Sequence, residues 1–286
     1  MFEEIKYKIY NDIDTDLNVD ELKVLYGIDN IYSNANKELI IYRRKDIYLD
    51  FCKIFGKSHV ACNPSSITEE TIAYIGNLSI NKKLPTYNLK YVYGNLEYKL
   101  DKIYNLENLE IVYRNANLRY IKCAEGLENL KLVCAIDCTN LENSEGLENL
   151  KYIYGVGIFS KLKNAKGLIS LKEILGSAKF ISLEYANGLE NLEIINYGSA
   201  YFPNLKDTES LINLKYIKYS AWFENIKSAK GLEKLEYIGL DANFPSLESA
   251  KYLENLKHIG GSHNFGCNRL TLYEFRGKDK EKCLKI

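Results

Sequence analysis

The stretch GLENLKYIYGVGIF, residues 146–159, contains the phrase that decides the fold. Its first half holds the tetrad Leu-x-x-Leu, which recurs along the chain at a nearly constant interval. The first leucine of the tetrad stands at Leu106, Leu127, Leu147, Leu168, Leu189, Leu211, Leu232 and Leu253. Successive copies are therefore 21, 20, 21, 21, 22, 21 and 21 residues apart. Chance does not hold one phase over eight copies, so the chain is predicted to be a repeat protein.

Aligning the copies on this leucine, which we call column one, gives every repeat the same apolar pattern. Column four is leucine in all eight copies, and column seven is valine or isoleucine, from Val112 to Ile259. Columns seven, eleven and thirteen are apolar or small at the period of two that is typical of a strand. Leucines three residues apart suit a bend instead. Column thirteen is mostly aromatic, with Phe159, Phe180, Tyr201, Phe223, Phe244 and Phe265.

One repeat holds too few apolar residues to close a core by itself, whereas coils stacked about 4.8 Å apart bury them continuously. We therefore predict a mainly β fold, a parallel β-solenoid with about 21 residues per coil and about ten coils. Two degenerate coils precede the clear ones, because residues 74–78 and 91–96 share a pattern. The solenoid is assigned to residues 67–275, a helix-containing N-terminal cap to 1–66 and a charged tail to 276–286.

The phrase Leu-Glu-Asn-Leu-Lys-Tyr-Ile-Tyr-Gly, residues 147–155, resembles a leucine-rich repeat. It is most similar to the bacterial BspA-like repeats and to the coils of receptor L domains, and the resemblance covers about 70% of the chain. It implies a non-catalytic solenoid that binds proteins. The usual strand phrase Leu-x-x-Leu-x-Leu-x-x-Asn is absent, so a curved horseshoe and a straighter β-helix both remain open.

The N-terminal region lacks the repeat and has two interpretations. A short helix is expected at residues 19–26, and a second one carries its apolar side chains on one face. That face comprises Leu39, Ile40, Ile47, Phe51, Ile54 and Phe55. The region is either a cap, which a solenoid needs at its ends, or a separate functional domain.

Composition argues against several classes of function. Lys plus Arg and Asp plus Glu are equal at 38 each, whereas a nucleic-acid-binding protein usually carries a basic excess. No apolar stretch approaches the 18 residues of a membrane span. The start of the chain lacks the basic and apolar regions of a signal peptide, and its seven cysteines lack the spacing of a secreted disulfide module. We therefore expect a cytoplasmic protein, without excluding delivery as an effector.

Candidate metal-binding residues form no convincing site. The segment 12–16, Asp-Ile-Asp-Thr-Asp, starts like a calcium-binding loop but has Leu17 and Lys23 where such a loop needs glycine and glutamate. His258, His263 and Cys267 are zinc-ligand types, yet they occupy different columns of one coil and so should not converge. We predict no metal and no cofactor.

Candidate catalytic residues are equally weak. Cys134 and Cys138 share one coil with Asp137, but no histidine stands at a matching column of a neighbouring coil to activate a thiol. The asparagines of column three are interpreted as structural side chains of the bend, and the glutamates of column two as a solvated face. We predict that the chain is not an enzyme.

The outward columns eight, ten and twelve carry the best candidates for function. Several of their residues are apolar, including Ile136 and Cys138. Aligned apolar side chains on an outer face indicate either a partner-binding patch or contact with the N-terminal region or a flanking loop. The candidate partner-binding residues are Tyr113, Tyr154, Ile158, Leu175 and Trp222.

Three functional hypotheses follow. The first is a non-catalytic protein–protein interaction module that binds a protein partner through one solenoid face. The second is a targeting arm of a secreted effector, or of a protein whose N-terminal region carries the activity. The third is self-association into a homodimer through an uncovered edge.

Overall fold

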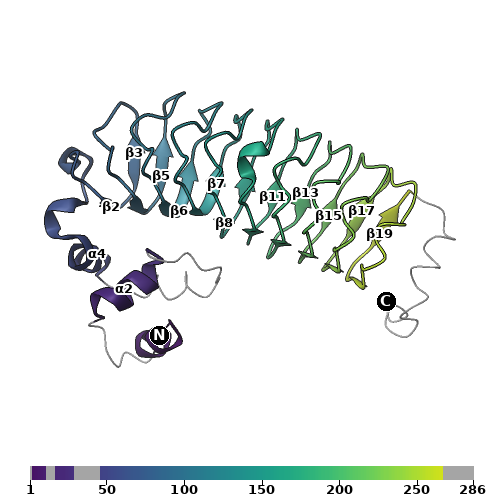
Figure 1. The fold of residues 1–286 in the computed structure, drawn as a ribbon, viewed down its shortest axis with the longest axis horizontal. Coiled ribbons are helices and arrows are strands. Elements are labelled where there is room, and N and C mark those ends of the chain that lie inside the picture. Colours follow the sequence, from purple (N-terminus) through teal and green to yellow (C-terminus); the bar gives the residue numbers. More distant parts are fainter. Residues whose placement is uncertain (1, 11–16, 29–45, 267–286) are drawn as a thin grey trace.

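A computed structural model describes residues 2–10, 17–28 and 46–266 of the chain. In these ranges three α-helices precede a parallel β-solenoid whose coils stack in a gently curved row (Figure 1). The helices are α1 (Phe2–Tyr10), α2 (Val19–Tyr26) and α4 (Ile47–Phe55). Helices α2 and α4 lie beside the first coils of the solenoid, and α1 packs against α2. The bounds of α2 confirm the helix expected at residues 19–26. Short 3-10 turns occur at Lys57–His59, Pro64–Ser66 and Lys166–Leu168.

Two ladders of parallel strands run along the solenoid, and each coil after β1 contributes to both. Ladder A contains β1 (Val60–Ala61), β2 (Ala73–Ile75), β4 (Tyr91–Tyr93), the first residues of β6 (Ile111–Asn117) and β7 (Leu132–Asp137), β8 (Tyr152–Ile153), β10 (Glu173–Ile174), β12 (Ile194–Ile195), β14 (Tyr216–Ile217), β16 (Tyr237–Ile238) and β18 (His258–Ile259). Ladder B contains β3 (Leu78–Ile80), β5 (Leu96–Tyr98), the last residues of β6 and β7, β9 (Gly157–Ile158), β11 (Ala178–Lys179), β13 (Ala200–Tyr201), β15 (Ala221–Trp222), β17 (Ala242–Phe244) and β19 (His263–Phe265).

The register of these ladders reproduces the repeat. Ile174 pairs with Ile153 on one side and with Ile195 on the other, so column seven stacks on itself. Ladder B has ten strands among the described residues, which nine turns of about 21 residues connect. Isolated parallel bridges such as that of Asn143 with Asn164 mark a third side of the coil. The predicted parallel β-solenoid is thus confirmed.

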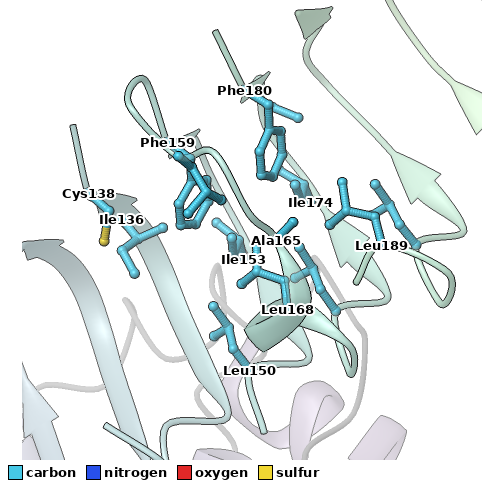
Figure 2. Packing of buried hydrophobic residues seen from close by; sticks show 14 of the residues in the cluster. Ile136, Cys138, Leu150, Ile153, Phe159, Ala165, Leu168, Ile174, Phe180 and Leu189 are labelled. Carbon is cyan, nitrogen blue, oxygen red and sulfur yellow. The ribbon is translucent and has the colours of Figure 1, made fainter. Parts of the chain in front are cut away.

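The interior is built from the inward columns. The leucines of columns one and four are buried in all eight copies, as are the isoleucines and valines of column seven from Val112 to Ile238. Figure 2 shows Phe159 and Phe180 at matching places in neighbouring coils. Ring centroids are 5.0 Å apart for this pair and 5.1, 5.3 and 5.2 Å apart for the pairs that follow. The stacked rings belong to Phe159, Phe180, Phe202, Phe223 and Phe244.

The placement of Tyr201 inside the core was wrong. Its coil has 22 residues, and the extra residue is absorbed at a corner where Tyr197 adopts a φ of 53°. Everything beyond that corner moves by one position, so Tyr201 pairs with Trp222 on the outer surface. Phe202 takes the inward place and is fully buried.

The 20-residue coil reverses the prediction for Ile136 and Cys138 in the same way. Ile136 pairs with Gly157, an inward position, and is 1% exposed. Cys138 lies one rung before Phe159 and is completely buried. The outward residue of this rung is Asp137, which pairs with Ile158.

Asparagines tie six of the eight bends to the coil before them. The side-chain amide of Asn149 donates a hydrogen bond of 2.7 Å to the backbone carbonyl of Glu128, in the preceding coil. The same bond is made by Asn108, Asn129, Asn191, Asn213 and Asn255. The acceptor is therefore backbone rather than another asparagine, and the contact satisfies a carbonyl that a tight bend leaves unpaired.

The glutamates of column two were expected to form a solvated face, and Glu107 and Glu254 are indeed exposed. The other four, Glu128, Glu148, Glu190 and Glu233, instead accept a hydrogen bond from a glycine N–H. The carboxylate of Glu190 accepts hydrogen bonds of 3.0 and 3.1 Å from the backbone N–H of Gly188. That glycine has a φ of 100°, and a Cβ there would lie 2.0 Å from the carbonyl oxygen of Ala165. The glutamate thus caps a corner that requires glycine both for its backbone angle and for close approach.

The column assignment predicts a large difference between inward and outward substitutions. Leu192→Ala should lower the free energy of unfolding by about 2–5 kcal/mol, because it leaves a cavity in a fully packed core. Glu190→Ala should cost about 1 kcal/mol through the lost hydrogen bonds to Gly188. The exposed Glu224→Ala should stay within about 0.5 kcal/mol of wild type in urea titrations. Equal losses in all three variants would contradict the assignment.

The asparagine ladder can be tested by removing and by adding a member. Asn149→Ala should destabilise the chain by about 0.5–1.5 kcal/mol, since the carbonyl of Glu128 loses its donor. Column three holds Ser170 in one coil, where Ser170→Asn should raise the urea midpoint slightly. A lower midpoint for Ser170→Asn would show that the ladder does not stabilise the bend.

Candidate functional site

The outer surface of the first ladder A strands is covered by the N-terminal helices. Helix α2 begins with a capping box, in which Asn18 and Glu21 exchange hydrogen bonds, and it ends at Gly27 with a φ of 68°. It buries Leu22, Leu25 and Tyr26. Together with Phe51 of α4, these side chains form a second hydrophobic cluster with Tyr91, Tyr93, Ile111 and Leu132 of the sheet.

Polar contacts fix this helical layer in place. The hydroxyl of Tyr26 donates a 2.7 Å hydrogen bond to the carboxylate of Asp50, which joins α2 to α4. The hydroxyl of Tyr113 donates a 2.8 Å hydrogen bond to the backbone carbonyl of Tyr26, which joins the solenoid to α2. Burial of the Tyr113 hydroxyl raises its pKa well above 10.0.

Three of the five predicted partner-binding residues are engaged inside the chain. Tyr113 makes the contact with α2, and Tyr154 packs against the same cluster. Leu175 is only 8% exposed, so it offers little surface to a partner. Tyr113 and Tyr154 therefore contact the N-terminal region, which was the alternative to a partner-binding role for the outward columns.

The other two predicted residues, Ile158 and Trp222, lie half-buried on the outer face of ladder B. They belong to one outward column, in which Ile158, Lys179, Tyr201 and Trp222 occupy successive rungs. The rings of Tyr201 and Trp222 stack with centroids 6.3 Å apart and planes 7° apart. The structure therefore adds Tyr201, which the 22-residue coil had concealed, to the surface around Trp222.

A second group of exposed apolar residues, missed from the sequence, lies at the corner between the ladders. Tyr197, Tyr219 and Leu240 are 65%, 44% and 45% exposed, and they stand in three consecutive coils. The two coils before them have Gly155 and Gly176 at this corner. The sequence shows the change from glycine to a large side chain at this corner. Only the fold shows that these large side chains point outward.

These residues are taken together as the aromatic patch, which spans three coils. Its members are Tyr197, Tyr201, Tyr219, Trp222 and Leu240. The supporting backbone is regular, since the N–H of Leu240 donates to the carbonyl of Tyr219 at 3.2 Å and β13, β15 and β17 are paired. The patch is thus a set of large side chains on a rigid support.

A cleft of about 650 Å³ opens on the third side of the early coils. Acidic and basic side chains line it together, among them Asp101, Glu107 and Lys122. Glu128 in its lining accepts a 2.7 Å hydrogen bond from the backbone N–H of Gly126, and so caps a corner of the coil. The mixed lining defines no ligand, so the aromatic patch is the stronger candidate.

The described residues bring no set of metal ligands together. No group of three or more His, Cys, Asp or Glu residues in that part of the chain could hold a metal ion. His258 instead stacks on Tyr237 at 4.5 Å. Burial raises the pKa of the Cys138 thiol, which opposes the thiolate form that a nucleophile needs. The segment 12–16 and Cys267 lie outside the described residues.

Comparisons with known proteins give two results, and the helices give a third. No protein-family model matches the sequence. A comparison with curated proteins finds no significant match. Among the described helices, none has the length and apolar character needed to cross a membrane.

The contact between Tyr113 and α2 predicts a specific effect of pH. Because burial raises the pKa of Tyr113, the folded chain holds this proton at a pH where the unfolded chain loses it. Stability from this group is therefore complete below about pH 10 and falls as the pH rises further. Tyr113→Phe should cost about 1 kcal/mol at pH 7 and should weaken the loss of stability above about pH 10.

Urea titrations of both proteins across this range provide the measurement. Part of the alkaline loss should remain in the variant, since burial also raises the pKa of Tyr98 to about 12. An unchanged alkaline profile in Tyr113→Phe would contradict the assignment of this effect to Tyr113.

Proposed function

We propose that this chain is a non-catalytic protein-interaction module that binds a protein partner through the aromatic patch. The observation that carries the proposal is the presence of five large side chains on the outer surface of three consecutive coils, with Tyr201 and Trp222 in register. Tyrosine and tryptophan are enriched among the residues that dominate binding energy at protein interfaces. They contribute a large contact area and lose little side-chain entropy.

The rigidity of the support favours binding by the patch. The stack of Tyr201 on Trp222 limits the freedom of both rings before a partner arrives, and this reduces the entropic cost of association. Ile158 and Lys179 extend the same outward column toward the N-terminus. Trp222 and Ile158 thus remain in the proposed surface, whereas Tyr113, Tyr154 and Leu175 leave it because they pack within the chain.

Further parts of the proposal concern family and location. The Leu-x-x-Leu phrase, the 21-residue interval and the parallel coils support a bacterial leucine-rich-repeat protein related to the BspA-like repeats. Cys52, Cys62, Cys123 and Cys138 are free cysteines, which fits a reducing compartment such as the cytoplasm. The core that α2 and α4 share with the solenoid supports the cap interpretation of the N-terminal region.

Affinity capture from the native host tests the proposal. The double variant Tyr219→Asp, Trp222→Asp should lose the proteins that wild type retains, because two carboxylates cannot be buried in an apolar interface without a large cost. Tyr120→Asp is the matched control, since Tyr120 is 51% exposed but lies outside the patch. Equal thermal midpoints should show that all variants are folded.

Retention of the same proteins by wild type and by the double variant would remove the aromatic patch from the proposed function. Loss of capture in Tyr120→Asp but not in the double variant would move the binding surface to another side of the coil.

A further inference from the structure

Two cysteines lie where the last helix of the N-terminal layer passes over the first strand of the solenoid. Cys52 is in α4 and is half-buried, and Cys62 follows β1 directly and is exposed. The 3-10 turn Lys57–His59 stands between the two elements, and α4 packs back against β1. Cα atoms of α4 and β1 approach within 8 Å of each other, and a disulfide joins Cα atoms about 4.4–6.8 Å apart. A bond between side chains of these two elements therefore requires little movement of the backbone.

The contacts of α4 determine the direction in which Cys52 points. Phe51 faces the sheet, where its ring centroid lies 6.0 Å from that of Tyr113 in β6. Asp50 faces α2, since its carboxylate accepts the hydrogen bond from Tyr26. Tyr26 in turn lies over β6, because its carbonyl accepts the hydrogen bond from Tyr113. Successive residues of a helix are about 100° apart, so Cys52 lies on the side of Phe51 opposite to Asp50, away from β6 and toward β1.

The register of β1 determines the direction of Cys62. Val60 pairs with Ala73, and both belong to the outer cluster beneath α4. Ala61 pairs with Tyr74, and both belong to the inner core. Side chains alternate between the two faces of a strand, so the next residue, Cys62, points to the outer side, which α4 covers.

Tyr48, one helical turn before Cys52, provides a separate indication that the two sulfurs are near each other. The pKa of Tyr48 is raised by a hydrogen bond with Cys52, by burial, and by the charges of Cys52 and of Cys62. One hydroxyl of α4 is thus close to both thiols. This agrees with the directions derived from the helix and from the strand.

We propose that Cys52 and Cys62 form a redox modification site, at which a peroxide converts the two thiols into a reversible disulfide that fastens α4 to the first coil. This inference does not rest on the proposed function, because it concerns the N-terminal layer and not the aromatic patch. In the reduced chain the layer is held by apolar contacts and by hydrogen bonds such as that of Tyr26 with Asp50. The disulfide adds a covalent bond at the edge of the layer that lies over β1.

The oxidation proceeds in two steps. The thiolate of the exposed Cys62 attacks an oxygen of hydrogen peroxide, so an S–O bond forms, the O–O bond breaks, and the released hydroxide takes up the thiol proton as water. The thiolate of Cys52 then attacks the sulfenic sulfur, so an S–S bond forms, the S–O bond breaks, and a second water leaves with the second thiol proton. The two sulfurs together lose two electrons, which the peroxide gains. A small dithiol reverses the reaction by thiol–disulfide exchange.

Disulfide mapping on the full chain tests the inference. The reduced protein is treated with an excess of hydrogen peroxide, alkylated and digested with trypsin. Cleavage after Lys53 and Lys57 places the two cysteines in separate peptides, 46–53 and 58–82, so their disulfide is detected as a linked pair. This pair should be the main oxidised product, and dithiothreitol should remove it. Cys62→Ser should abolish it, whereas the control Cys123→Ser should leave it unchanged.

Urea titration gives a second readout that a merely structural role of Cys62 would not move. Peroxide should raise the urea midpoint of wild type, because the bond restricts the loop 52–62 in the unfolded chain, and dithiothreitol should restore the original value. Cys62→Ser should match reduced wild type and should gain nothing from peroxide. Recovery of Cys52 and Cys62 as alkylated thiols, pairing of either with another cysteine as the main product, or a midpoint that peroxide leaves unchanged or lowers would each overturn the inference.

Discussion

The stacking of each inward side chain on its counterpart in the next coil is the constraint on which this structure depends. Phe180 lies between Phe159 and Phe202 with centroid distances of 5.0 and 5.1 Å, which is close to the separation of paired strands. A coil can gain or lose a residue only where this stacking is not interrupted. The 22-residue coil accordingly places its extra residue at a corner, at Tyr197, and keeps Ala200 and Phe202 in register with their neighbours.

Corners carry a second constraint, because tight bends leave backbone polar groups without partners inside the coil. Asn149 and Glu190 show the solution, in which column three supplies a donor to a carbonyl and column two supplies an acceptor to a glycine N–H. The most regular polar side chains of the sequence therefore stabilise the fold. Irregular outward positions such as Tyr219, where earlier coils have glycine, are free to serve another purpose.

The sequence predicted the solenoid, its period and the helix at 19–26 because each depends on local spacing. It could not predict which side of a coil absorbs an insertion, so Tyr201 and Cys138 were assigned to the wrong faces. The apolar face of α4 predicted that this face is buried. The sequence of the helix does not show which part of the solenoid the face packs against. Tyr113 joins the solenoid to α2 through a hydrogen bond to the carbonyl of Tyr26. Local spacing cannot predict this contact, because the two residues are 87 positions apart in the chain.

The same outward column of ladder A serves two ends of the molecule differently, and the one-dimensional architecture explains how. Each coil contacts only its neighbours, so an outward residue can change without disturbing distant coils. Tyr91 and Leu132 pack beneath the chain's own helices. Ile194 and Tyr237 lie in the same column beyond Glu173, and they are half-buried outside that cluster. A column that is apolar beneath the helices thus carries a carboxylate, Glu173, a few coils later. Inward columns keep the coils alike, and outward columns give each part of the solenoid its own contacts.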